Sequence, residues 1–379
     1  MCRGPVYQAL PNSDTQPVIL YGLCRETLHI PAYCQMRGFG KAETEFMGAV
    51  KHKAKIRKDE YIQFLRGCAM IAVVLIHCLP QADWILFLRP FLNCAVAMFL
   101  FLSGLLTPVD KCIDISSFYK RRIGKILIPY VFWSCVYLIV ARQTNPFAII
   151  KSLCLGTSAA QMYFLLVYAQ MVLLTPLLYK VLNSKYGWLL WLVTPVTLVV
   201  REIAVWRGTE MMAVSFAFFG SWLIYYILGL RWRTIAKHFN HLGLTACAVI
   251  VTLVLQMASA LYWNKVGCFS LASTQIKVTA MISTLAIIIF SMQIPALVRK
   301  EVSQCRLIVL IGDCSYGVYL CHMLFLVCIR KACESAGMSV ANVWGALLLW
   351  ILTLAVSTAV VWICQRVLPT SLQRILGFE

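Results

Sequence analysis

Ten apolar stretches, each close to the length that crosses a membrane, follow one another along this chain with short connections between them. A membrane-spanning helix needs about 17–25 mostly apolar residues. Composition agrees, since 13% of the 379 residues are charged, against about 25% in soluble domains. The sequence predicts an all-α polytopic membrane protein, a bundle of about ten transmembrane helices near residues 62–79, 84–106, 123–141, 160–181, 186–200, 213–230, 242–263, 275–297, 307–329 and 342–365.

The charge distribution predicts how the bundle is oriented. The chain has 34 Lys and Arg against 15 Asp and Glu, a net charge of +19. Basic residues of membrane proteins collect in cytoplasmic loops. If the N-terminus is cytoplasmic, the inner segments hold 20 cations, and the outer ones hold only Arg142, Lys151, Arg201, Arg207, Lys265, Lys277, Arg330 and Lys331. We therefore expect both termini in the cytoplasm, a cell (plasma) membrane location and no nucleic-acid partner.

The remaining residues divide around one transmembrane domain, expected over 58–365. Residues 1–57 are expected to form a cytoplasmic tail, and 366–379 a second, shorter one. The first 46 residues read either as a real tail or as an over-extended start, because Met47 opens a basic segment that leads into the first span. Residues 1–46 contain no long apolar run, so they are not expected to act as a signal peptide.

Seventeen cysteines are scattered through apolar segments, and none forms a C-x-x-C pair. This distribution is typical of free thiols that pack like small apolar side chains. The sequence therefore predicts no metal site.

Few ionisable residues fall within the spans, and such residues are functional candidates because burying them in a bilayer is costly. Arg66 and His77 are eleven residues apart, which places them on one helix face about 16 Å apart. They read either as a snorkelling arginine and an interfacial histidine, or as an anion-binding arginine and a reactive histidine. His322 is predicted at the depth of His77, as part of one site or as a separate polar cross-link, and Asp313 lies nearer the inner face. Arg89 completes the set.

Two further motifs lie at the predicted inner face. Ser103 and Gly104 end the second span, and small residues there permit close helix packing. Arg121, Arg122 and Lys125, with Lys120 beside them, begin the third span. Helix starts attract anions and arginine pairs with phosphate, so this cluster reads either as a phosphate site or as a lipid headgroup contact.

Taken together and in this order, the motifs resemble those of the acyltransferase 3 family of multi-pass membrane acyltransferases. The resemblance covers about residues 58–365. The matching segments are Tyr61–Gly67 with His77, Phe99–Gly104, Arg122–Pro129, Tyr163–Leu165 followed by Pro176, Phe219–Gly229, and Ser315–His322.

The resemblance implies a role for each matched residue. It implies that His77 and Arg66 are the essential histidine and arginine of the first helix, and that Arg122 and Lys125 engage the acyl donor. Arg121 and Ser103 are their expected neighbours in that donor site, with His322 and Asp313 as further candidates. Two departures stand out, because Gln63 replaces an aspartate that precedes the arginine in many relatives, and Tyr163 replaces a tryptophan.

The implied activity is that of a membrane O-acyltransferase. Acyl-CoA, most simply acetyl-CoA, would be the donor substrate, no cofactor would be permanently bound, and the acceptor would be a hydroxyl of an extracytoplasmic glycan or glycolipid. Some relatives carry an added SGNH-type esterase domain, whereas this chain resembles a stand-alone member. His77 would act as a general base or would accept the acyl group covalently. The alternatives are a polysaccharide or lipid exporter and a non-catalytic membrane protein built on the same bundle.

The charge asymmetry yields a test of the orientation. A thiol introduced near Trp206 or Glu334 should react with an impermeant reagent added outside intact cells, above the background of the unmodified chain. A thiol near Asp114 should not react. Strong labelling at 114 would reverse the orientation.

Overall fold

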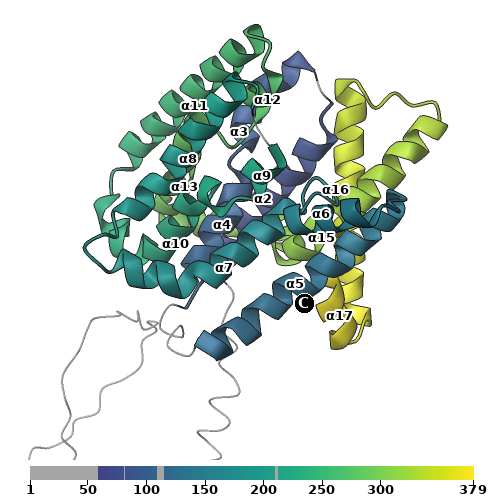
Figure 1. The fold of residues 1–379 in the computed structure, drawn as a ribbon, viewed down its shortest axis with the longest axis horizontal. Helices are drawn as coiled ribbons and strands as arrows, with labels where there is room; N and C mark the ends of the chain where they lie inside the picture. The colour runs from purple at the N-terminus through teal and green to yellow at the C-terminus, as the bar shows by residue number, and fades with distance from the viewer. Residues whose placement is uncertain (1–58, 81, 109–114, 210–211) are drawn as a thin grey trace, which may run out of the picture. The chain divides into compact units, whose positions relative to one another are not determined.

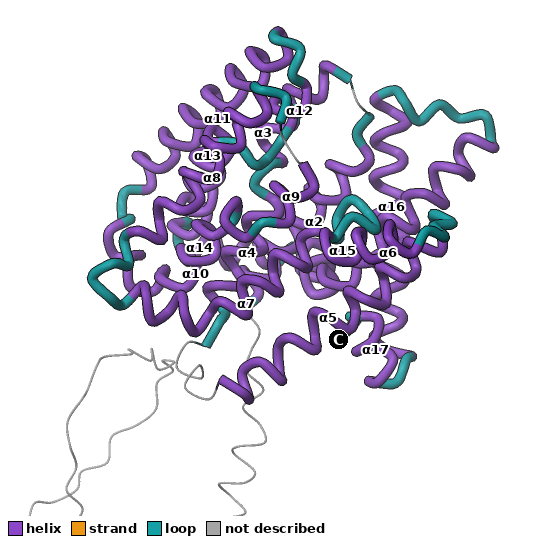
Figure 2. Tube along the Cα trace, viewed as in Figure 1, coloured by secondary structure: helices purple, strands orange, loops and turns teal. Residues whose placement is uncertain are grey.

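The computed structural model describes residues 59–80, 82–108, 115–209 and 212–379, and the regular structure in these ranges is entirely helical (Figures 1 and 2). The predicted tail over 1–57 and the loop residue Asp114 lie outside the described residues. In the described part, eight segments are long and apolar enough to cross a membrane, which confirms the polytopic all-α class. They are α2 (Glu60–Cys78), α5 (Ile115–Val140), α7 (Tyr163–Leu182), α8 (Leu189–Trp206), α11 (Leu242–Lys265), the pair α12 (Phe269–Ser273) and α13 (Val278–Gln293), α15 (Arg306–Ser335) and α16 (Val343–Val367).

The second predicted span, 84–106, is broken rather than continuous. It consists of η1 (Asp83–Phe87), α3 (Arg89–Leu92) and α4 (Ala95–Leu105). Pro90 contributes to the break because it has no N–H to donate within a helix. Asn93, just after α3, directs its side-chain Nδ2 to the Thr274 carbonyl at 3.2 Å. This hydrogen bond ties the break to a distant segment of the chain.

The sixth predicted span, 213–230, is also broken, into α9 (Met212–Ala217), η3 (Phe219–Ser221) and α10 (Leu223–Ile235). Gln170 of α7 bonds both sides of the break. Its Nε2 donates to the Ala217 carbonyl at 2.8 Å, and its Oε1 accepts from the Phe219 N–H at 3.0 Å. Irregular backbone at membrane depth is tolerated where protein groups satisfy it in this way.

Two cations near the break between α12 and α13 were wrongly counted as outer-loop residues. Arg201 and Lys277 are only 4% and 1% exposed, so they are not loop cations. Arg201 donates to the Ile276 carbonyl at 2.5 Å, and Lys277 donates to the Ala272 carbonyl at 3.1 Å. Both therefore bond the broken backbone. Removing them from the eight outer cations strengthens the predicted asymmetry.

The contact between α2 and α15 lies at the centre of the described residues. A Cβ atom on Gly67 would collide with the Ile308 carbonyl oxygen, and one on Gly312 would collide with the Gln63 carbonyl oxygen. Glycine at both positions lets the two backbones touch, as small residues do at membrane helix interfaces. This close approach sets the depth of α15 relative to α2.

A second close contact joins α4 and α10. Gly104 faces the Tyr226 carbonyl, and Gly229 faces the Phe101 carbonyl, again without space for a side chain. Gly104 therefore has the close-packing role expected of the Ser103–Gly104 pair.

The remaining described helices are short: α6 (Pro146–Leu155), η4 (Ala236–His238), α14 (Ala296–Ser303) and α17 (Thr370–Leu376). Helix α17 falls within the segment predicted as a tail over 366–379. It packs against α5, near the label C in Figure 1.

The glycine contact predicts a stability defect. Gly312→Ala should lower the free energy of unfolding by about 1–3 kcal/mol, because the added methyl group overpacks a backbone contact. Gly243→Ala is the matched control, since Gly243 has no neighbour within 4 Å among the described residues. Thermal melting of both variants in detergent measures the difference. If the two variants had equal melting temperatures, the tight backbone contact at Gly312 would be contradicted.

Candidate functional site

A cavity of about 380 Å³ brings together four cations from three helices. Arg66 comes from α2, Arg122 and Lys125 from α5, and Arg374 from α17. We call it the cation cavity. Ser103 lines it as well, so four of the residues predicted from the sequence meet here. Arg121 is exposed and does not line this cavity.

Arg122 is held in place by two neighbours. Its Nη1 donates to Thr107 Oγ1 at 2.9 Å, and its guanidinium lies 5.3 Å from the centre of the Phe118 ring. Cation–π contacts of this kind contribute about 0.5–1 kcal/mol at exposed sites. The hydroxyl of Thr107 donates in turn to the Ser103 carbonyl at 2.7 Å. Thr107, just after α4, therefore orients the Arg122 guanidinium, which lies two turns into α5 and not at its start, where it was expected from the sequence.

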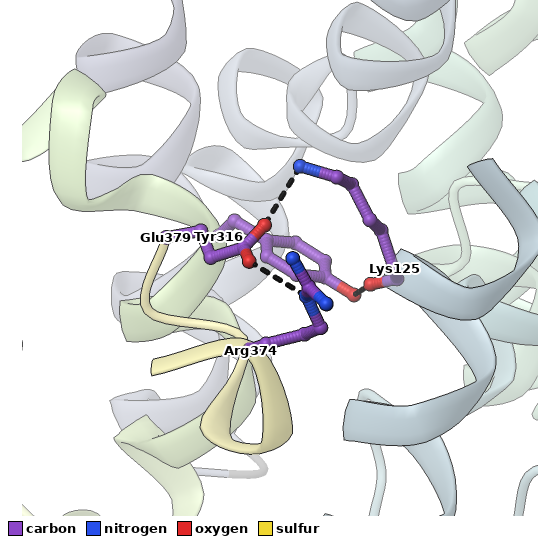
Figure 3. Close-up of polar contacts among 4 residues, drawn as sticks. All are labelled: Lys125, Tyr316, Arg374 and Glu379. Atoms are coloured by element: carbon purple, nitrogen blue, oxygen red, sulfur yellow. Dashed lines mark hydrogen bonds and ion pairs between the residues drawn. The ribbon is translucent and has the colours of Figure 1, made fainter. Parts of the chain in front are cut away.

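Lys125 and Arg374 share one carboxylate (Figure 3). Lys125 Nζ donates to Glu379 Oε2 at 2.7 Å, and Arg374 Nε donates to Glu379 Oε1 at 3.0 Å. The Tyr316 hydroxyl donates to the Lys125 carbonyl at 3.0 Å. The hydrogen bond from Lys125 lowers the pKa of the Glu379 carboxyl, so the carboxylate stays charged at neutral pH. This ion pair closes one side of the cation cavity.

Arg66 obtains an anionic neighbour from another helix. Position 63, which is an aspartate in many relatives, is a buried glutamine. Its backbone carbonyl packs against Gly312. The carboxylate of Asp313 on α15 attracts the Arg66 guanidinium electrostatically. Asp313 lines neither of the two cavities described here. It is therefore placed to attract Arg66 rather than to meet a substrate.

A second cavity, of about 190 Å³, is lined by His77 of α2. We call it the histidine cavity. The rings of His77 and His322 lie 5.4 Å apart between their centres, so the two histidines are at one level. His322 is fully buried, and its Nδ1 lies 3.0 Å and 2.9 Å from the Val318 and Tyr319 carbonyls.

The carbonyls beside His322 determine where its proton sits. A carbonyl oxygen only accepts hydrogen bonds, so Nδ1 is the protonated nitrogen of the neutral ring. Nε2 is then an acceptor, and it has no hydrogen-bond partner among the described residues. The arrangement orients the His322 ring beside His77.

Tyr319 separates the two cavities and lines both of them. Its hydroxyl donates to the backbone carbonyl of Gln161 at 2.5 Å. Its ring lies 5.1 Å from that of Phe164 and 5.9 Å from that of His322. Because Arg66 and His77 are three turns apart on α2, the cation cavity and the histidine cavity follow one another along that helix, with Tyr319 between them.

Three polar residues of the histidine cavity, Arg89, Gln161 and Gln275, had been given no specific role from the sequence. Gln161 is 1% exposed, and neither polar atom of its amide has a partner in the part of the chain that the structure describes. Arg89 Nε and Gln275 Oε1 are also buried without a partner among the described residues. The other polar atom of the Gln275 amide, Nε2, donates to the Tyr163 hydroxyl at 2.8 Å. A buried polar group without a partner costs about 1–3 kcal/mol, so these groups indicate a place for water or ligand. Arg89 had a sequence signal, a cation inside an apolar stretch, whereas the two glutamines had none.

Comparison with known protein families identifies the family to which the chain belongs. Residues 59–366 match the family model described as an acyltransferase domain. The chain therefore belongs to the acyltransferase 3 family and is a multi-pass membrane acyltransferase. No curated protein and no solved structure matches the chain.

The cation cavity generates a prediction about donor binding. Arg122→Ala combined with Lys125→Ala should weaken acetyl-CoA binding, because both cations line the cavity, while insertion and folding persist. Binding by the unmodified protein should also weaken as salt rises, since phosphate contacts at an interface are screened. Equilibrium binding to purified protein measures both effects. Unchanged affinity in the double variant would assign the cluster to lipid headgroups.

Proposed function

We propose that this acyltransferase moves an acyl group, acetyl in the simplest case, from cytoplasmic acyl-CoA to a hydroxyl of an extracytoplasmic glycan or glycolipid. One observation carries the proposal. The cation cavity and the histidine cavity lie in sequence along α2 and meet at Tyr319.

The cation cavity suits the donor. CoA carries several phosphate charges on a long pantetheine arm, and arginine binds phosphate through parallel charge-assisted hydrogen bonds. Arg122 and Lys125 would hold phosphates at the predicted cytoplasmic side. The arm would then extend past Arg66 and Ser103, which line the same cavity. Its thioester would arrive at Tyr319, next to the histidine cavity.

His77 would carry the chemistry. As a general base, the neutral imidazole takes the proton of the acceptor hydroxyl while the oxygen attacks the thioester carbonyl. The carbon–sulfur bond breaks, and the proton passes from His77 to the leaving CoA thiolate. In the covalent route, His77 attacks the thioester first, CoA leaves, and the hydroxyl then takes the acyl group from the imidazole. Both routes end in an ester and CoA.

The histidine cavity suits a small polar acceptor. Its volume of about 190 Å³ compares with an engineered protein cavity of about 150 Å³ that binds benzene, so it has space for one sugar-sized ring. Arg89, Gln161 and Gln275 would hydrogen-bond the hydroxyls of that ring.

His77 provides the direct test. His77→Gln keeps much of the side-chain volume and hydrogen-bonding capacity, so the protein should insert and bind donor normally. Loss of the base or nucleophile should lower transfer by about 10²–10⁴-fold. Acetyl transfer from labelled acetyl-CoA, in membranes with matched expression, measures the effect.

His322→Gln serves as the companion variant. Its effect should be smaller, because His322 lies beside the histidine cavity and bonds its own helix backbone. Near-normal transfer by His77→Gln would contradict the mechanism and would revive the exporter alternative.

A further inference from the structure

Glu379 places a carboxylate in the cation cavity between two cations that come from different helices. Each oxygen has its own donor, Lys125 at 2.7 Å and Arg374 at 3.0 Å (Figure 3). All three residues line the cavity, together with Arg66 and Arg122. The two cationic side chains are 61% and 60% exposed, whereas that of Glu379 is 29% exposed. The Glu379 side chain is thus more enclosed than the side chains of Lys125 and Arg374.

The segment that carries Glu379 is anchored rather than loosely attached. Phe378 is 3% exposed and packs on Trp133, with the ring centres 6.2 Å apart. The indole of Trp133 donates to the Leu376 carbonyl at 3.0 Å. Gly377 ends α17 with φ at 70°, a left-handed conformation that favours glycine. These contacts fix the backbone next to Glu379, so little backbone freedom remains to be lost in forming its ion pairs.

The same contacts constrain α15. A Cβ atom on Gly317 would collide with the Phe378 ring and with Val361. The absence of a side chain at 317 therefore makes room for the anchor, one residue from Tyr316, whose hydroxyl bonds the Lys125 backbone. The position of Glu379 depends on three helices that also build the cation cavity.

We propose that Arg374 is a further phosphate-binding residue of the donor site, and that the Glu379 carboxylate occupies the position of a donor phosphate until acyl-CoA displaces it. The inference rests on the proposed function, because it takes a phosphate-bearing acyl donor as the ligand of the cation cavity. No covalent step is involved. One anion replaces another on Lys125 and Arg374.

Physical chemistry supports the exchange. Carboxylate and phosphate oxygens accept the same charge-assisted hydrogen bonds from lysine and arginine, and a phosphate group offers more acceptor oxygens. While the cavity is empty, Glu379 compensates two cations that would otherwise repel each other. When donor binds, that carboxylate competes for the cations, so Glu379 lowers donor affinity and disfavours ligands without a phosphate.

The decisive variant is Glu379→Gln in the full chain. Exposed ion pairs contribute about 0.2–1 kcal/mol each, so removing both pairs should tighten acetyl-CoA binding by about twofold to thirtyfold. The gain should shrink at high salt, and it should be absent for S-acetylpantetheine, which has no phosphate. Glu301→Gln is the matched control, because Glu301 is an exposed carboxylate on α14 that lines neither cavity. It should leave the affinity unchanged.

Arg374→Gln supplies the second arm, measured in the Glu379→Gln background, where no resident carboxylate masks the guanidinium. Acetyl-CoA binding should weaken by about 1.5-fold to fivefold. Unchanged binding there would remove Arg374 from the donor site. An equal gain for S-acetylpantetheine in Glu379→Gln would mean that the effect does not depend on a donor phosphate, and it would contradict the proposed exchange.

The proposed function and the proposed role of Glu379 and Arg374 can be disproved separately. If the Arg122 and Lys125 double variant loses acetyl-CoA binding but Glu379→Gln binds like the unmodified protein, only the role of Glu379 and Arg374 is wrong. If the unmodified protein binds no acetyl-CoA, the proposed function fails and this inference fails with it.

Discussion

The direct backbone contact between α2 and α15 is the constraint on which the site depends. Gly67 and Gly312 let the two helices touch, and in that register His322 lies beside His77. The same register places Tyr319 between the two cavities and brings Asp313 near Arg66. A side chain at either glycine would separate the helices, so the spacing of the candidate catalytic groups is tied to two residues that have no chemistry of their own.

Buried polar residues serve two different purposes in this bundle, and their partners distinguish them. Gln170, Arg201 and Lys277 bond the backbone where helices break, so they replace the hydrogen bonds that a continuous helix would have made. Gln161 and Arg89 keep buried atoms that have no partner in the described ranges, and both line the cavity of His77. The first group maintains the fold. The second group is available to a ligand, which is why the proposed acceptor site is placed there.

Local sequence patterns predicted the polytopic helical class and three of the four cations that line the cation cavity, since hydrophobicity and clustered charge are readable one segment at a time. The eleven-residue spacing from Arg66 to His77 placed them on one helix face, and the structure has them lining successive cavities on α2. The patterns could not predict the breaks at 84–106 and 213–230, because the groups that stabilise broken helices come from distant segments. They also missed Gln161 and Gln275, whose significance arises only from burial without partners, and they counted the buried Arg201 as a loop residue.

The central claim is that the donor lies in the cation cavity with its thioester end at Tyr319, against the cavity of His77. A structure determined with a non-hydrolysable thioether analogue of acetyl-CoA tests this most directly. The account predicts phosphate density at Arg122 and Lys125, and the thioether within reach of Tyr319 and His77. Analogue bound elsewhere on the bundle, with lipid filling the cation cavity, would contradict it.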